Sequence, residues 1–208
     1  MAEGCNTKDT SFADFKTIDA QDLIRVHDTV CERLPDVVVQ KFDLLRRQRN
    51  TIMHTVDPRM RFTAFEVFRD ILAISDALIG GRAWVSCRRE YLESGPESLA
   101  YSTDHVDIVM IREFRRLLIP LQANELAKFF GYVKNQRAYF CPNCQQACRD
   151  HYEDAKFAQL QPNTPESKNL HCVVCECDFD VLREPCSENG CKGNVLEPDE
   201  RTCLSCYE

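Results

Sequence analysis

Cysteine is the residue that most constrains how this chain can fold, because most of its 13 cysteines lie in the last third of the sequence. Residues 1–140 contain three cysteines, and residues 141–208 contain ten. Formal charge changes at the same place: residues 139–208 carry 6 basic and 13 acidic residues, whereas residues 1–138 carry 20 of each. The net charge of −7 therefore belongs to the cysteine-rich tail. We predict two domains, at 1–138 and 139–208.

The sequence also argues against several classes of protein. No run of apolar residues approaches the roughly 18 that a membrane-spanning helix needs, so we expect no membrane partner. The N-terminal segment MAEGCNTKDTSF lacks the apolar stretch of a secretory signal. We therefore expect a cytoplasmic protein, in which reduced cysteines are better suited to bind metal than to form disulfides.

Four cysteine pairs in the tail have the spacing of metal ligands. Such spacing lets two sulfur atoms reach one ion while backbone N–H groups of the intervening turn point toward them. Eight thiolates suit two tetrahedral sites, so we predict about two structural Zn²⁺ ions per chain. Redox-active pairs or disulfides are the alternative. The predicted ligands are Cys141, Cys144, Cys172, Cys175, Cys186, Cys191, Cys203 and Cys206.

The order of these pairs leaves two arrangements open. In the sequential arrangement, the first two pairs bind one ion and the last two bind the other, as in zinc ribbons. In the interleaved arrangement, the pairs alternate between the ions, as in RING-type cross-braces. We favour the sequential arrangement because apolar Tyr139 and Phe140 precede the first pair, as in a ribbon. The unassigned candidates are Cys148, Cys177, His151 and His171, while Cys5, Cys31 and Cys87 are interpreted as incidental thiols.

The tail is predicted to bind protein rather than RNA. Four thiolates around one zinc ion leave a net charge of about −2, which adds to the acidic balance of this segment. Because nucleic-acid binding needs a basic surface, we expect a structural or protein-binding module here.

Residues 1–138 predict a bundle of about five helices. Apolar side chains recur at helical spacing over 20–34, 36–56, 63–79, 105–119 and 122–136. Thr63 and Glu66 form a predicted capping box, and a short strand is predicted at 83–86. The fold class is thus mainly α, with a helical bundle followed by a small zinc-binding tail that contains short β-hairpins.

An arginine interrupts the apolar stripe of the second predicted helix. This stripe runs from Val38 to Val56, and Arg49 occupies a gap in it. A guanidinium there requires an ion-pair partner, a solvent cleft or a second protein. His54 lies about 140° around the helix from Arg49, whereas Asn50 and His54 are four residues apart and face each other.

The segment Arg49-Asn50-x3-His54 resembles the R-x(4–6)-H signature of HEPN domains. The surrounding LLRRQRNTIMHTV resembles the motif helix of that superfamily. HEPN domains are small helical bundles that usually dimerise, and many are metal-independent ribonucleases of toxin and antiviral defence systems. The resemblance covers roughly residues 20–136 at the level of the fold, but its specific part is this short motif. Thr55 departs from the pattern, since many members have glycine at this place.

The resemblance implies a homodimeric endoribonuclease that cleaves RNA through attack of a 2′-hydroxyl on the adjacent phosphodiester. His54 would act as general acid and base, Arg49 would stabilise the charged transition state, and Asn50 would orient His54 or contact the phosphate. The alternative is a non-catalytic dimerising bundle with a zinc module that binds protein or RNA. Four further arginines would contact the RNA backbone: Arg46, Arg47, Arg59 and Arg61.

Overall fold

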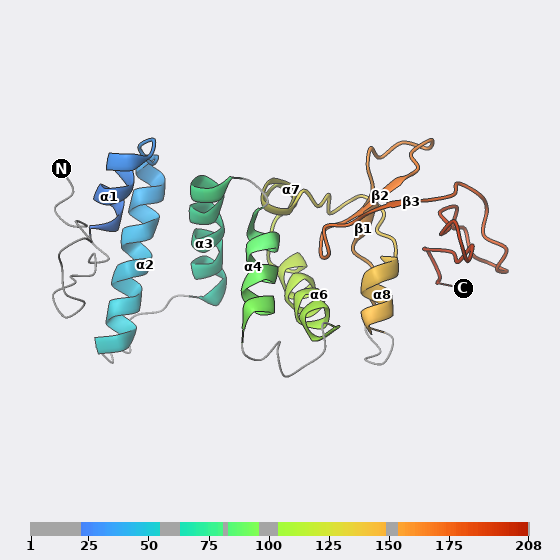
Figure 1. The fold of residues 1–208 in the computed structure, drawn as a ribbon, viewed down its shortest axis with the longest axis horizontal. Coiled ribbons are helices and arrows are strands. Elements are labelled where there is room, and N and C mark those ends of the chain that lie inside the picture. Colours follow the sequence, from blue (N-terminus) through green and yellow to red (C-terminus); the bar gives the residue numbers. More distant parts are fainter. Residues whose placement is uncertain (1–21, 55–62, 81–82, 96–103, 149–153, 208) are drawn as a thin grey trace, which may run out of the picture. The chain divides into compact units, whose positions relative to one another are not determined.

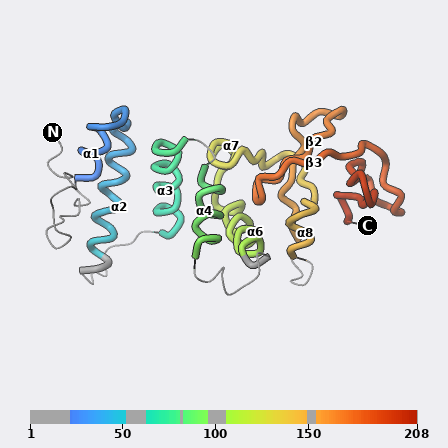
Figure 2. The backbone as a smooth tube through the Cα atoms, viewed as in Figure 1, coloured from blue at the N-terminus to red at the C-terminus, as the bar shows by residue number. Residues whose placement is uncertain are grey.

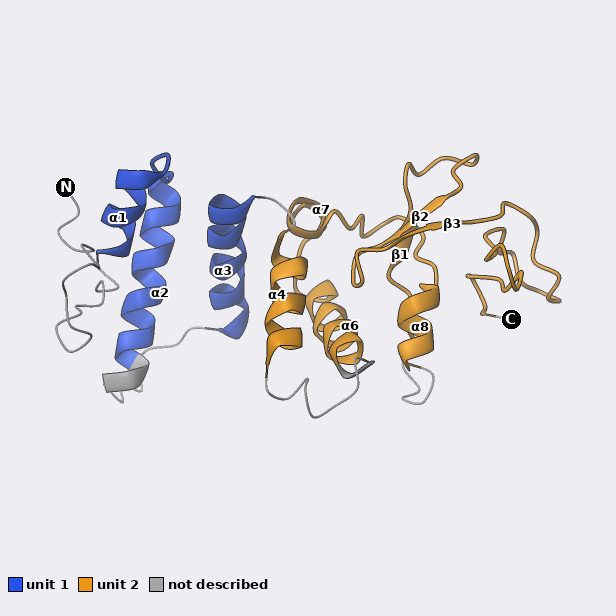
Figure 3. Ribbon diagram, viewed as in Figure 1, with its two compact units in different colours: residues 1–80 blue, residues 81–208 orange. Residues whose placement is uncertain are grey.

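The chain forms two compact units in the computed structural model, residues 1–80 and residues 81–208 (Figure 3). This division differs from the predicted domain boundary after residue 138, because helices of the predicted body belong to the same unit as the cysteine-rich tail. The structure describes residues 22–54, 63–80, 83–95, 104–148 and 154–207.

The predicted fold class is confirmed, since the described residues are mainly helical, with a small sheet and two four-cysteine clusters toward the C-terminus (Figure 1). The described helices are α1 (Leu23–Val30), α2 (Asp36–His54), α3 (Ala64–Ile79), α4 (Ala83–Ser94), α6 (Asp104–Leu118), α7 (Ala123–Phe130) and α8 (Pro142–Cys148). The described strands are β1 (Ala158–Leu160), β2 (Asn169–Cys172) and β3 (Asp178–Asp180). None of these helices is long and apolar enough to cross a membrane.

The N-terminal unit contains α1, α2 and α3, and α2 packs against α3. The ion pair between Lys41 and Asp70 joins these two helices. The predicted capping box opens α3: the Thr63 hydroxyl accepts a hydrogen bond from the Glu66 N–H over 3.2 Å, and a Glu66 carboxylate oxygen accepts one from the Thr63 N–H over 3.0 Å. This cap satisfies two N–H groups that a helix start otherwise leaves without partners.

The predicted strand at 83–86 is wrong, because these residues begin α4. Val85 is buried, and the Trp84 ring packs edge-to-face on Phe130 at a centroid distance of 5.7 Å. Arg88 and Arg89 of the same helix form ion pairs with side chains of α6. These contacts, distant in sequence, determine the conformation of the segment more strongly than its local propensity.

Two predicted helices are shorter in the structure. The helix expected over 20–34 spans Leu23–Val30 among the described residues. The helix expected over 122–136 ends at Phe130, because Gly131 adopts a left-handed conformation with φ 67°. Its N–H bonds back to the carbonyl of Ala127, which is a common way for a helix to end.

Helix α6 lies at the centre of the C-terminal unit, where it packs against α4 and α8. The Phe114 ring makes edge-to-face contacts with Phe130, Tyr132 and Phe157. The antiparallel sheet has the order β1-β2-β3, and Figure 2 follows the backbone from this sheet into the C-terminal loops. The cysteine-bearing segments are therefore built onto a helical core of the same unit.

Candidate metal centres and the motif helix

The first cluster contains the sulfur atoms of Cys141, Cys144, Cys172 and Cys175, which lie within 4.8 Å of one another. The distance from Cys141 Sγ to Cys175 Sγ is 3.6 Å, and that from Cys144 Sγ to Cys172 Sγ is 3.8 Å. Four sulfurs arranged tetrahedrally around zinc at about 2.3 Å are separated by about 3.8 Å. The cluster therefore has the dimensions of a tetrathiolate zinc site.

Local structure positions the four ligands of the first cluster. Pro142 begins α8 directly after Cys141, at the position where a missing N–H is tolerated best. Cys172 ends β2, and a turn leads from it to Cys175. The Cys172 N–H donates to the Cys177 carbonyl over 3.0 Å, which closes this turn. Three of the four cysteines are fully buried, as expected of ligands that form part of a core.

Helix α4 holds the Cys172–Cys175 turn from outside the cluster. Arg89 donates to the Val174 carbonyl over 3.2 Å and to Asp107 of α6 over 2.7 Å. Burial opposes the charge of Arg89, but the hydrogen bond to Asp107 and the nearby carboxylates outweigh burial and raise the pKa of the guanidinium. One helical turn earlier, the Ser86 hydroxyl donates to Glu176 over 2.8 Å.

Thiols as close as those of the first cluster cannot all ionise without a cation. Hydrogen bonds with Cys141, Cys144 and Cys172 lower the pKa of Cys175, whereas hydrogen bonds with its cluster neighbours raise the pKa of Cys144. The opposite shifts arise because neighbouring thiolates repel each other. A divalent cation would neutralise half of this charge and allow all four sulfurs to act as thiolate ligands.

The second cluster contains Cys186, Cys191, Cys203 and Cys206, again within 4.8 Å of one another. Its sulfur–sulfur distances are 3.7 Å between Cys186 and Cys206 and 3.9 Å between Cys191 and Cys203. Cys203 is buried, and the other three ligands are half-buried. These distances also fit a tetrathiolate zinc site, so each cluster could hold a metal ion such as zinc.

Backbone N–H groups point toward sulfur atoms in the second cluster. The N–H of Gly193 donates to Cys191 Sγ over 3.3 Å. Burial opposes the thiolate form of Cys203, but hydrogen bonds from Ser205, Cys206 and Cys186 outweigh burial and lower its pKa to about 7. A Cβ atom on Gly193 would lie 2.7 Å from Cys203 Sγ, so only glycine fits beside this ligand.

The clusters use the eight predicted ligands in sequential order, the first two pairs in one group and the last two in the other. Those unassigned candidates that the structure describes are not members of either cluster. Cys148 is buried on α8, and burial raises the pKa of Cys177 to about 11. His171 Nδ1 lies 3.1 Å from Asp178 Oδ1. Cys31 and Cys87 are exposed, whereas Cys5 and His151 lie outside the described residues.

The predicted catalytic residues lie in the C-terminal half of α2. Arg49 is exposed, and its Nη1 lies 3.5 Å from Asn50 Oδ1. His54 ends the helix, and its side chain is outside the described part of the structure. The structure thus brings Arg49 and Asn50 together, and a joint site with His54 stays a prediction.

The flanking arginines are described in part. Arg46 pairs with Asp43 over 3.3 Å, and Arg47 is exposed. Arg59 and Arg61 lie outside the described residues. Arg47 and Arg49 are thus both exposed on α2, and the setting of Arg49 stays a prediction.

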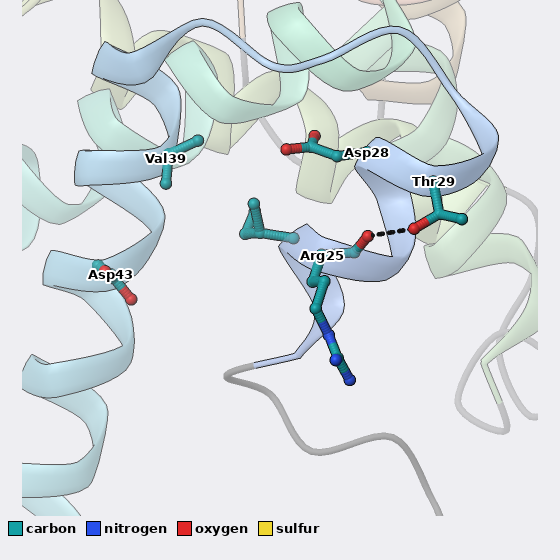
Figure 4. Close-up of a pocket in the computed structure, with 6 residues that line it drawn as sticks. Arg25, Asp28, Thr29, Val39 and Asp43 are labelled. Carbon is teal, nitrogen blue, oxygen red and sulfur yellow. Dashed lines mark hydrogen bonds between the residues drawn. The ribbon is translucent and has the colours of Figure 1, made fainter. Parts of the chain in front are cut away.

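A hollow of about 530 Å³ lies between α1 and α2 (Figure 4). Asp28 of α1 and Val39 of α2 lie on its two sides, and the Thr29 hydroxyl donates to the Arg25 carbonyl at its rim. Arg49 and Asn50 are not among its lining residues. The hollow therefore lies apart from the described residues of the predicted catalytic motif.

Sequence reasoning missed the residues that support the clusters. Ser86 lay in the segment predicted as a strand, and Arg89 lay just beyond it. The residues Val85, Arg89 and Leu92 nevertheless follow the helical spacing that would have identified the helix. Gly193 carries no local signal, because its role depends on the approach of Cys203 from ten residues further on.

Comparisons of the chain with protein-family models, with curated proteins and with solved structures find no match. The function must therefore be inferred from the chain's own residues.

Proposed function

We propose that this chain is a HEPN-type endoribonuclease that acts without a metal ion in its active site. The observation that supports this proposal best is the exposed Arg49 beside the half-buried Asn50 in the signature Arg49-Asn50-x3-His54. A guanidinium beside a side-chain amide at the surface of a long helix is accessible to a phosphate group. Two copies of this helix in a homodimer would bring a second His54 and Arg49 to one cleft, which overcomes their separation around a single helix.

The proposed chemistry is transesterification of RNA. A 2′-hydroxyl attacks the neighbouring phosphorus, the bond to the 5′-oxygen breaks, and the products are a 2′,3′-cyclic phosphate and a 5′-hydroxyl. His54 accepts the proton of the attacking hydroxyl or donates one to the leaving oxygen. Arg49 stabilises the added negative charge on the phosphorus oxygens. Asn50 positions His54, which lies one helical turn away.

The zinc ions are proposed to be structural, one in each four-cysteine cluster. All four positions around each ion are taken by thiolates, which leaves none open for a substrate. The ions would replace the large apolar core that a small segment like the tail lacks. Such thiolate sites persist in the reducing cytoplasm, where we propose that the protein acts.

The test is RNA cleavage by the purified full chain, compared with Arg49→Ala and His54→Ala. Matched controls are Arg25→Ala, whose side chain is 79 % exposed, and His27→Ala, both on α1. We expect EDTA-resistant cleavage in samples shown to retain zinc, and a loss of about 100-fold or more in both motif variants. Unchanged cleavage in the motif variants, or no cleavage in any sample, would contradict the proposal.

The second candidate function is a non-catalytic dimerising bundle whose zinc module binds protein or RNA. Exposed apolar side chains on the helices of the N-terminal unit favour it: Val30 is 76 % exposed, Val37 57 % and Ile79 52 %. A surface through which helices associate leaves apolar side chains exposed in the single chain. A homodimer in sedimentation experiments, together with no RNA cleavage, would support this function over the first.

A further inference from the structure

A groove lies along the edge of β3 that does not pair with β2. It forms because a proline ends the antiparallel pairing between the segment after β3 and the segment around Leu196. Just after β3, Leu182 and Leu196 exchange two backbone hydrogen bonds of 2.8 and 3.0 Å. Continued in the same antiparallel register, this ladder would place Pro198 opposite Asp180. Proline has no N–H to donate, so the pairing cannot continue there.

The backbone groups of Asp178 and Asp180 face this opening. Alternate residues of a strand direct their N–H and C=O groups toward the same neighbour. Cys177 and Val181 bond to the β2 side, through Cys172 N–H to Cys177 over 3.0 Å and Val181 N–H to Lys168 over 2.8 Å. Asp178 and Asp180 therefore present their backbone groups on the other side, as Leu182 does toward Leu196.

The opening is a groove of about 330 Å³, here called the acidic groove. Phe179 and Leu204 contribute apolar surface to it. Asp178 accepts a hydrogen bond from Asn169 over 3.4 Å and lies 3.1 Å from His171 Nδ1, but no lysine or arginine in the described part of the chain pairs with the carboxylates of the groove. Burial raises the pKa of one of them, Glu197, and the neighbouring Glu200 and Asp199 raise it further. The four carboxylates that line the groove are Asp178, Asp180, Glu197 and Asp199.

We propose that the acidic groove binds an extended segment of a partner protein that carries lysine or arginine. The segment adds as a strand to the free edge of β3, and its basic side chains pair with the carboxylates. The backbone groups that the proline leaves unpaired at the edge of β3 are those that an added strand would bond to. The four acidic residues that line the groove complement basic side chains on such a strand. The same carboxylates repel phosphate, so RNA does not fit this groove. The proposal is independent of RNA cleavage by the N-terminal unit.

The test measures binding of a labelled six-residue peptide of alternating lysine and threonine to the zinc-loaded full chain, by fluorescence anisotropy. The test variant is Asp180→Asn with Glu197→Gln, which keeps shape and removes two charges. The control variant is Glu166→Gln with Glu188→Gln, which removes two charges from exposed residues that do not line the groove. A second peptide has the same side chains but N-methyl groups on alternate backbone nitrogens.

We expect the groove variant to weaken binding about tenfold and the control variant to change it less than twofold. The N-methylated peptide should bind the wild-type chain much more weakly, because it cannot form the ladder. Equal weakening by both variants would show that only net charge matters and would overturn the proposal. Equal binding of both peptides, or no binding of the lysine peptide, would also overturn it. Zinc content and circular dichroism establish that each variant is folded.

Discussion

The two cysteine clusters have the same ligands and nearly the same dimensions, yet different surroundings. In the first cluster three of the four cysteines are fully buried, and α8, which carries Cys144 and directly follows Cys141, packs against α6. In the second cluster three ligands are half-buried, and the described supports are hydrogen bonds from nearby loop N–H groups. The comparison indicates that the effect of losing a metal ion depends on what is packed against its ligands.

Direct contacts nevertheless join the segments that carry the two clusters. The Phe140 N–H, next to the first ligand Cys141, donates to the Leu204 carbonyl over 2.8 Å, between two ligands of the second cluster. The Phe140 ring also contacts the Tyr207 ring at a centroid distance of 5.3 Å. These contacts join the loops of the second cluster to the core that contains the first cluster. We therefore expect the second cluster to depend on the first for its folded structure more than the first depends on the second.

The largest expected effect is that of Cys144→Ser in the first cluster. The variant should lose one zinc ion and about 5 kcal/mol or more of unfolding free energy, because metal binding and folding are coupled. Amides of α6 around Ile111 and Phe114 should then exchange with solvent freely. The control is Cys87→Ser, which changes an exposed cysteine on α4. Retained protection of α6 after loss of the ion would show that the first cluster does not support the core.

A smaller effect is expected of Cys191→Ser in the second cluster. This variant should also lose one zinc ion, but unfolding should be confined to the loops around residues 186–206, and α6 should keep its slow amide exchange. Hydrogen exchange with mass spectrometry distinguishes the two outcomes. If Cys191→Ser exposed α6 as fully as Cys144→Ser, the proposed difference between the clusters would be wrong.

The variants Arg89→Ala and Arg88→Ala test the support of the first cluster by residues that are not metal ligands. Each should lower the unfolding free energy by about 2 kcal/mol, since each removes a charged hydrogen bond to α6. Only Arg89 also bonds to Val174 in the Cys172–Cys175 turn. Arg89→Ala alone should therefore accelerate zinc release to a chelator several-fold. Equal release rates in the two variants would remove Arg89 from the support of the first cluster.

The smallest effect is expected of Glu197→Gln in the acidic groove. Because the pKa of Glu197 is raised in the folded chain, the folded state holds its proton to higher pH than the unfolded state. The free energy of unfolding therefore falls as the pH rises from the ordinary pKa of a glutamate through the raised pKa of Glu197, and it stays lower at neutral pH. The variant should be more stable than the wild type at pH 7, by less than about 0.5 kcal/mol, and equally stable well below pH 4. Thermal unfolding at the two pH values checks this, and a destabilised variant at pH 7 would contradict it.

Local signals in the sequence predicted much of the fold and of the metal centres. The eight ligands follow from pair spacing, and the start of α3 follows from Thr63 and Glu66, because both patterns depend on neighbours in the chain. Helix α4 differs from the predicted strand because the local propensity of residues 83–86 favours a strand, whereas the spacing of Val85, Arg89 and Leu92 and the contacts with α6 favour a helix. The division after Gly80 was missed because composition separates the cysteine-rich tail from the neutral body, whereas packing joins α6 to α8. The acidic groove depends on strand register, which no single segment reveals.

The most direct measurement is hydrogen exchange of the full chain during stepwise zinc removal, with bound metal counted by native mass spectrometry at each step. We expect two zinc ions per chain. The first to leave should come from the more exposed second cluster and should leave α6 protected, and loss of the second ion should remove that protection. Fewer than two ions in the intact chain, or a protected α6 in the zinc-free chain, would contradict the claim that two zinc sites hold this unit and that only the first is part of its core.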